Sequence, residues 1–247
     1  MLGSLADGSV IVERYGDGPI DVVALHGWGR PATDFSKVLE GYNAASVYLP
    51  GFGTIDPPPR AWVPADYAEW LLPALDPERP PILVGHSFGG RIAVRLAARH
   101  PERVSGLALT GVPLTKLHQA KGPDWRYALI RSLHGMGVVS DKQMESARRR
   151  FGSADYRAAT GVMRDVLVHT VGEDYLDDVA TLSMPVELVW GEFDRPAPLQ
   201  VAKIALERLA HGRLTVADGS EHLLDDTLER HLRSAIDRLR GTQAGRK

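Results

Sequence analysis

The residues best suited to covalent chemistry meet in one short stretch, residues 82–93, which reads ILVGHSFGGRIA. Ser87 stands there between Gly85 and Gly89, in the pattern G-x-S-x-G. When a strand turns into a helix within one or two residues, the positions beside the apex come too close for side chains, so glycine fits them. The apolar run before the serine and the amphipathic segment after it predict such a turn. Ser87 is therefore the candidate nucleophile, and the alternative is a glycine-rich loop with an incidental serine.

A serine hydroxyl is a poor nucleophile at neutral pH, so it requires a base, and the base requires a group that orients it. Nine histidines are available. His222 lies in VADGSEHLL, a loop between the last apolar run and the last helical pattern, and open α/β sheets build their sites from such loops. His222 is the candidate base. His86 is expected to point away from the serine, and His26 is expected to order its loop.

The orienting carboxylate is expected just beyond the apolar run in VELVWGEFDRPAP. Asp194 has the G-x-x-D spacing that carries a carboxylate past the end of a strand and into a site. Glu192 is the second candidate and is otherwise a solvated turn residue. Asp218, next to the histidine loop, is a weaker rival. The predicted set is Ser87, Asp194 and His222.

Short apolar runs predict the strands that would position these side chains. The middle runs are almost uninterrupted, as in strands covered on both faces. The runs lie at 9–15, 21–27, 45–50, 80–85, 104–111, 185–191 and 212–218. Helical patterns lie at 65–75, 88–100 and 225–239. This alternation predicts an α/β fold, with a mostly parallel twisted sheet and helices on both faces.

One region interrupts the alternation. Between 112 and 183 the sequence shows four helical patterns and no convincing strand. We therefore expect a helical cap, 112–183, inserted into a core made of 1–111 and 184–247. Residues 115–164 carry ten Lys and Arg against four Asp and Glu, a balance of +6. A basic cap would attract an anionic substrate or an acidic carrier protein, although solvated helix faces are the simpler interpretation.

Composition limits the class of protein. A formal net charge of −2 over 247 residues gives no reason to expect nucleic acid or an anionic membrane as a partner. The absence of cysteine excludes disulfides, a thiol nucleophile and thiolate metal ligands. No apolar run reaches the roughly 18–20 residues of a membrane span. The first ten residues lack the apolar core of a signal peptide, so we expect a cytoplasmic protein.

Taken together, these motifs resemble the α/β-hydrolase fold family over nearly the whole chain. That family orders its catalytic residues as nucleophile, acid and base, which is the order predicted here. The stretches HGWGRPATDF and YLPGFG are similar to small capped carboxylesterases, including the pimeloyl-carrier-protein methyl esterase type. The loop TIDPPPR departs from the family pattern and the cap matches no motif, which leaves the substrate open. The motifs that carry the resemblance are HGWG, LPGFG, GHSFGG, WGEFD and GSEH.

The resemblance also implies a site and a reaction. Two backbone N–H groups, those of Trp28 and Phe88, would form an oxyanion hole, while the alternative for the Trp28 indole is an apolar wall of the acyl pocket. The implied activity is hydrolysis of a carboxylic ester or thioester through an acyl-enzyme on Ser87. Its substrate would be a small-molecule ester or a carrier-bound acyl group, and no metal or organic cofactor is implied. A cofactor-free lyase and a non-catalytic ligand-binding protein of the same fold are the alternatives.

Overall fold

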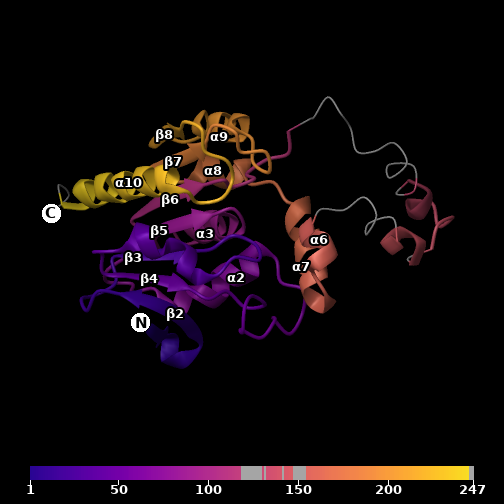
Figure 1. Cartoon of the computed structure of the whole chain (residues 1–247), viewed down its shortest axis with the longest axis horizontal. Helices are drawn as coiled ribbons and strands as arrows, with labels where there is room; N and C mark the ends of the chain where they lie inside the picture. Colours follow the sequence, from indigo (N-terminus) through magenta and orange to yellow (C-terminus); the bar gives the residue numbers. More distant parts are fainter. Residues whose placement is uncertain (118–129, 131, 141, 147–153, 245–247) are drawn as a thin grey trace. The chain divides into compact units, whose positions relative to one another are not determined.

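The computed structural model describes residues 1–117, 130, 132–140, 142–146 and 154–244. Within these ranges eight strands form one sheet, in the order β1-β2-β4-β3-β5-β6-β7-β8 (Figure 1). β1 pairs antiparallel with β2, and β2 with β4, whereas the other neighbouring strands are parallel. The strands are β1 (Leu2–Leu5), β2 (Val10–Tyr15), β3 (Val22–Leu25), β4 (Ala44–Val47), β5 (Ile82–His86), β6 (Gly106–Thr110), β7 (Val186–Gly191) and β8 (Gly212–Ala217).

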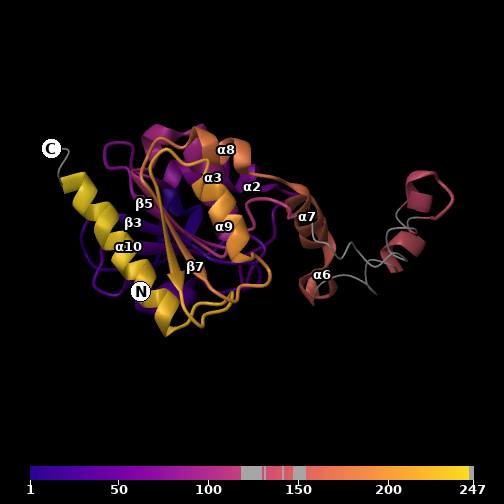
Figure 2. The ribbon, with the colours of Figure 1, turned by 90° about the horizontal axis from the view of Figure 1, so that it is seen from above.

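The central strands are rich in small and β-branched residues because helices cover both of their faces. Every residue from β3 to β7 that lies in a strand is buried, whereas the edge strands β1 and β8 keep exposed positions. Figure 2 shows α10 (Asp226–Ala244) on one side of the sheet and four helices on the other, α2 (Pro64–Leu71), α3 (Phe88–Arg99), α8 (Leu176–Thr181) and α9 (Leu199–Leu206). The predicted fold, a mostly parallel sheet with helices on both faces, is confirmed.

Helices are present at the three predicted patterns, 65–75, 88–100 and 225–239, and two more, at 36–39 and 199–206, were not predicted. In the described ranges, no helix combines the length and the apolar character that spanning a membrane requires. The α-helices are α1 (Ser36–Leu39), α2 (Pro64–Leu71), α3 (Phe88–Arg99), α8 (Leu176–Thr181), α9 (Leu199–Leu206) and α10 (Asp226–Ala244). The 3₁₀ turns are η1 (Ala6–Gly8), η2 (Ala32–Phe35), η3 (Leu72–Ala74) and η4 (Pro101–Arg103).

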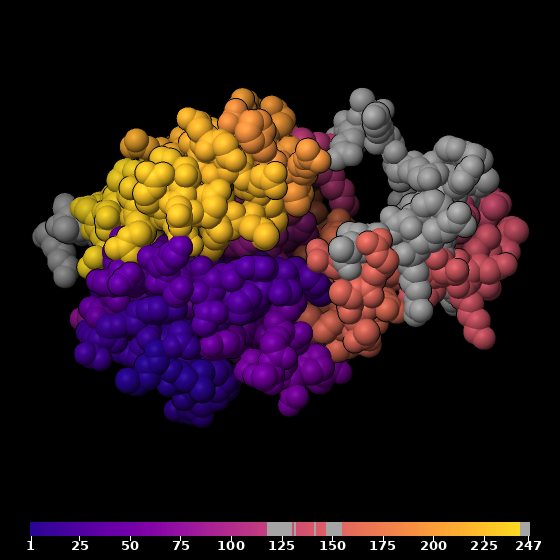
Figure 3. All heavy atoms as spheres, in the orientation of Figure 1, coloured from indigo at the N-terminus to yellow at the C-terminus, as the bar shows by residue number. Residues whose placement is uncertain are grey.

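The C-terminal helix, α10, is joined to α1 and the residue that follows it by an ion pair and hydrogen bonds. Lys37 Nζ lies 2.9 Å from an Asp226 carboxylate oxygen. The Arg233 guanidinium donates to the carbonyl oxygens of Lys37, Val38 and Glu40 at 2.7–3.0 Å. A cation at a helix C-terminus satisfies its unpaired carbonyls and its negative dipole end. In Figure 3 the yellow C-terminal residues accordingly lie against the indigo and purple residues of the N-terminal part.

The chain divides into two compact units. The sheet unit comprises Met1–Pro58, Trp62–Lys116 and Glu173–Lys247, and the second unit comprises Pro59–Ala61 and Leu117–Gly172. The second unit contains α6 (Ala154–Ala158) and α7 (Gly161–Gly172). The helix α8 lies within the predicted cap range 112–183 but packs against α3 in the sheet unit. A capping role for the second unit stays a prediction.

Candidate active site

The predicted strand-to-helix turn is present, with Ser87 as the single residue between β5 and α3. Ser87 has φ 49° and ψ −110°, and a positive φ in a non-glycine residue costs about 1–3 kcal/mol and is typical of functional sites. The glycines on either side are sterically required. A β-carbon on Gly85 would lie 2.5 Å from Gly90 Cα, and one on Gly89 would lie 2.1 Å from the Leu25 carbonyl oxygen. The turn therefore presents a partly exposed serine on a rigid support.

His222 and Asp194 form a close pair. His222 Nδ1 lies 2.9 Å from Asp194 Oδ2 and 3.0 Å from Oδ1. The Asp194 side chain is 1% exposed and the His222 side chain 18%. A carboxylate only accepts hydrogen bonds, so Nδ1 carries a proton, and in the neutral form of the ring Nε2 is then an acceptor. Such a pair can take a proton from a hydroxyl while the carboxylate stabilises the cation that forms.

Ser87 and this pair follow strands of the sheet at the same end, the C-terminal end of the parallel strands. The Ser87 N–H donates to the Thr110 carbonyl oxygen at 3.0 Å. The next residue, Gly111, lies against the pair, because a β-carbon there would be 3.0 Å from both Asp194 Oδ2 and His222 Nδ1. Gly111 also has φ 58°, a region that favours glycine. The three predicted side chains thus belong to segments that follow β5, β7 and β8 at their C-terminal ends, where open α/β sheets place their sites.

The Asp194 carboxylate is held by its own loop. Its Oδ1 accepts a hydrogen bond from the Ala197 N–H at 2.7 Å. The Ala197 carbonyl in turn accepts the indole N–H of Trp190, a fully buried side chain of β7, at 2.6 Å. These contacts fix the carboxylate in the direction of His222. No sequence motif indicates these roles of Trp190 and Ala197, because the contacts depend on how the loop folds.

The two other candidate carboxylates have different surroundings. Glu192 is exposed, and its Oε2 accepts a hydrogen bond from the Gly219 N–H at 3.0 Å. Asp218 is exposed as well. Among the described residues, Asp194 is the carboxylate in contact with His222.

Trp28 and Phe88, whose N–H groups were predicted to bind an oxyanion, lie side by side. Their rings are 5.3 Å apart in an edge-to-face contact. Phe52 packs against both rings, at 4.9 and 5.7 Å. In the described part of the chain, no acceptor is hydrogen-bonded to either backbone N–H. Phe88 follows Ser87 directly in the chain, and unpaired backbone donors of this kind can stabilise a developing oxyanion.

His26 orders the loop that carries Trp28, as the sequence predicted. Its Nδ1 lies 2.8 Å from the Gly27 carbonyl oxygen, and its Nε2 accepts the Leu49 N–H at 3.2 Å. The first contact requires a protonated Nδ1 and the second an unprotonated Nε2, so the ring is neutral. Burial lowers the pKa of His26, which agrees with this neutral form.

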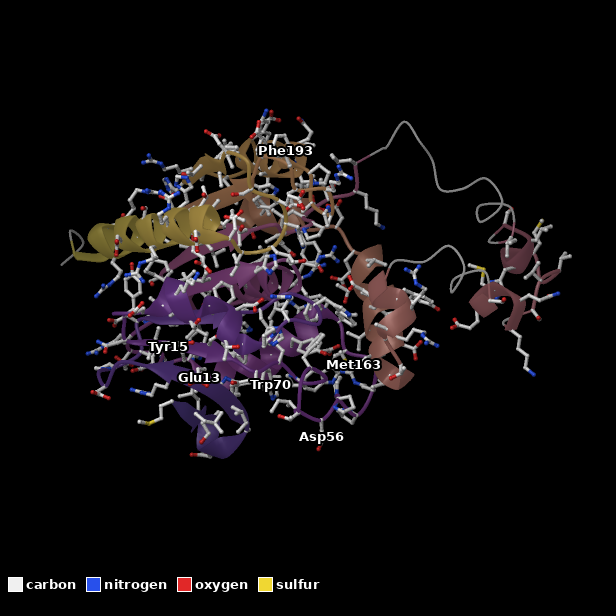
Figure 4. The ribbon with its side chains drawn as sticks, viewed as in Figure 1. Glu13, Tyr15, Asp56, Trp70, Met163 and Phe193 are labelled. Atoms are coloured by element: carbon white, nitrogen blue, oxygen red, sulfur yellow. The ribbon has the colours of Figure 1, made fainter. Side chains whose placement is uncertain are left out.

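Two apolar side chains next to the pair in sequence are exposed. Phe193 precedes Asp194 and is 56% exposed, and Leu223 follows His222 and is 51% exposed. Figure 4 shows Phe193 on the part of the sheet unit opposite to Glu13 and Tyr15, which lie on β2.

Comparisons with known proteins agree with this fold. A profile described as the Alpha/beta hydrolase family matches residues 22–235. A pimeloyl-[acyl-carrier protein] methyl ester esterase from Chromobacterium violaceum is 36% identical over 170 residues, 67% of this chain and 64% of that protein. A protein of the same name from Aromatoleum aromaticum is 31% identical over 235 residues, 82% of this chain and 90% of that protein. A solved esterase from Exiguobacterium antarcticum has a TM-score of 0.70 at 22% identity and covers 97% of this chain and 98% of that one.

The solved structure, at 22% identity, supports the fold alone. The two relatives above 30% identity support a common family. The resemblance stated from the sequence is confirmed, and so is the expected enzyme class, a carboxylesterase-type hydrolase. With the profile spanning most of the chain, this protein belongs to the alpha/beta hydrolase family.

Proposed function

We propose that the chain hydrolyses a carboxylic ester through an acyl-enzyme on Ser87, with His222 as the general base and Asp194 as the group that orients it. The observation that carries this proposal is the contact of 2.9 Å between His222 Nδ1 and the buried Asp194 carboxylate. A serine held at a positive φ at the start of a helix supports it. A helix N-terminus favours the negative charge that develops there.

The proposed reaction has two halves. His222 Nε2 accepts the Ser87 proton as Oγ attacks the carbonyl carbon, and the resulting oxyanion accepts hydrogen bonds from the Trp28 and Phe88 N–H groups. The intermediate collapses, the C–O bond to the alcohol breaks, and His222 returns the proton to the leaving alkoxide. His222 then accepts a proton from a water molecule as this water attacks the acyl carbon. The bond between that carbon and Ser87 Oγ breaks, His222 returns the proton to Oγ, and the carboxylic acid is released. Each oxyanion donor is worth on the order of 10²–10³ in rate.

For the substrate, we propose an ester of a small alcohol on an acyl chain, with a carrier-linked methyl ester as its first candidate. The names of the two relatives, pimeloyl-[acyl-carrier protein] methyl ester esterases, support this choice. The partly exposed ring of Trp28, which packs against the buried rings of Phe52 and Phe88, offers apolar surface to an acyl chain. The +6 balance of residues 115–164 suits an acidic carrier.

The test of the chemistry is steady-state hydrolysis of p-nitrophenyl butyrate by wild type, Ser87→Ala and Ser234→Ala, an exposed serine of α10. We expect Ser87→Ala to lose about 10⁴-fold or more in kcat with an unchanged melting curve, and Ser234→Ala to match wild type. Turnover retained by Ser87→Ala would contradict the nucleophile.

The test of the substrate compares methyl pimeloyl groups on acyl-carrier protein with the free dimethyl ester of the same acid. We expect a higher kcat/KM for the carrier-linked ester and a loss of that preference as salt rises, because charge attraction is screened. Equal values at all salt concentrations would contradict the carrier proposal and leave the ester chemistry intact.

A further inference from the structure

His86, the residue before the proposed nucleophile, is a buried titratable group that the reaction above does not use. It ends β5 and is 2% exposed. Its Nε2 lies 2.9 Å from the carbonyl oxygen of His222. The two imidazole rings are 4.9 Å apart, with 48° between their planes. The side chain that precedes the serine therefore contacts the main chain of the proposed base.

The hydrogen bond to the His222 carbonyl oxygen determines which nitrogen of the His86 ring is protonated. A carbonyl oxygen only accepts, so His86 Nε2 carries the proton and donates it. Burial, followed by the charge of His222, lowers the pKa of His86 to about 3. The charges of Arg30 and His26 lower this pKa as well, whereas the hydrogen bond to the His222 carbonyl oxygen raises it. His86 is thus a neutral donor at any pH at which an esterase works.

The other ring nitrogen faces the loop of the proposed oxyanion hole. A β-carbon on Gly27 would lie 2.7 Å from His86 Nδ1 and 3.0 Å from its Cε1. Gly27 directly precedes Trp28, so the imidazole fills the space that a side chain at 27 would need. The ring of His86 therefore contacts both the loop that carries Trp28 and the loop that carries His222.

We propose that His86 is a positioning residue of the proposed hydrolysis, which holds the main chain of His222 so that its imidazole stays aligned with Ser87. The inference rests on the proposed function. Asp194 restrains the His222 side chain at Nδ1, and His86 restrains the same residue at its carbonyl oxygen. Because these two hydrogen bonds hold opposite ends of His222, they limit how far its Nε2 atom can move. A displacement of about 1 Å in such a group costs on the order of 10²-fold in rate.

Two variants separate the hydrogen bond from the volume of the ring. His86→Phe keeps a planar ring and removes the donor, and His86→Gln keeps an amide N–H near the place of Nε2. We expect His86→Phe to lower kcat by about 10–100-fold at a KM within about twofold of wild type. We expect His86→Gln to recover most of that loss. His100→Phe, a partly exposed histidine at the end of α3, is the matched control and should behave as wild type.

The pH profile of kcat/KM is the second readout. A displaced His222 is less well stabilised by Asp194 as a cation, so His86→Phe should reach half of its plateau at lower pH than wild type. His86→Gln should restore the wild-type midpoint. Equal losses in both variants with unmoved midpoints would show that the residue only fills volume and would overturn the proposal. Wild-type activity in His86→Phe would overturn it as well.

If His86→Phe does not fold, the tautomer of the His86 ring in the wild-type protein tests the proposal instead. Nitrogen-15 NMR of the wild-type imidazoles should show one histidine that stays protonated on Nε2 alone from pH 5 to 9, and this signal should vanish in His86→Gln. A His86 that titrates in this range, or that carries its proton on Nδ1, overturns the proposal. Failure of the proposed function is recognised separately, by full activity in Ser87→Ala.

Discussion

The Glu192 carboxylate accepts a hydrogen bond from the Gly219 N–H at 3.0 Å and thereby joins the segment before Asp194 to the segment before His222. Glu192 and Asp194 are two positions apart in the sequence. Glu192 is exposed and its hydrogen bond stabilises a turn, whereas Asp194 is buried and contacts the His222 imidazole. Their variants should separate these roles. Asp194→Asn should lower kcat by about 10⁴-fold, because an amide favours the wrong imidazole tautomer, and Glu192→Gln should stay within about threefold of wild type. A larger loss in Glu192→Gln would reverse the assignment of the acid.

Gly111 gives a prediction about space at the site. Gly111→Ala should lower kcat by more than about tenfold, because its β-carbon would press on Asp194 and His222. Gly41→Ala is the matched control, since Gly41 also has a positive φ, 81°, but an open space around its β-carbon. Both variants should lose about 1 kcal/mol or more of unfolding free energy in urea from backbone strain, and only Gly111→Ala should lose activity. Full activity in Gly111→Ala would contradict the described packing.

The stability of the protein should depend on pH through His86. Its pKa is about 3 in the folded state and 6.5 as a free side chain, so between these values the unfolded chain binds a proton that the native chain does not. The unfolding free energy contributed by this group therefore rises with pH from about 3 to 6.5 and is constant above. His86→Gln should flatten the curve by about 2 kcal/mol between pH 5 and 7.5, measured by urea unfolding. An unchanged pH slope would argue against a buried, neutral His86.

The hairpin that joins β1 to β2 contains a strained position. Ala6 has φ 49°, and Asp7 and Gly8, with φ 54° and 93°, form the turn closed by the Ser9 N–H and the Ala6 carbonyl oxygen. Asparagine tolerates positive φ better than alanine. Ala6→Asn should therefore raise the unfolding free energy by about 0.5–1 kcal/mol without changing activity. A decrease in stability would mean that the alanine side chain contributes more by packing than it costs in strain.

The sequence predicted the strands from apolar runs, and seven of them lie where the structure has strands. It missed β1, because Leu2–Leu5 is short and has Gly3 and Ser4 side by side between its two leucines. The dipeptide Asp7–Gly8 is a strong hairpin signal, since both positions take positive φ, and it could have revealed this strand. Periodicity therefore finds buried strands, and edge strands need the chemistry of their turns.

For the site, motif spacing led to Asp194 and His222, whose contact the structure contains. Spacing could not reveal that His86 contacts the His222 carbonyl, because that contact depends on how three loops meet. The same holds for Trp190 and Ala197, which hold the Asp194 carboxylate. Motifs locate reactive groups, whereas the groups that support them depend on tertiary structure.

The covalent intermediate is the centre of the proposed mechanism, and mass spectrometry of the intact protein observes it directly. With an activated ester under rapid quench, wild type should gain the mass of one acyl group, and peptide mapping should place it on Ser87. Ser87→Ala should gain none, and His222→Ala should acylate about 10³-fold or more slowly. Turnover of the ester without any acyl group on Ser87, or an acyl group mapped to another residue, would contradict the account.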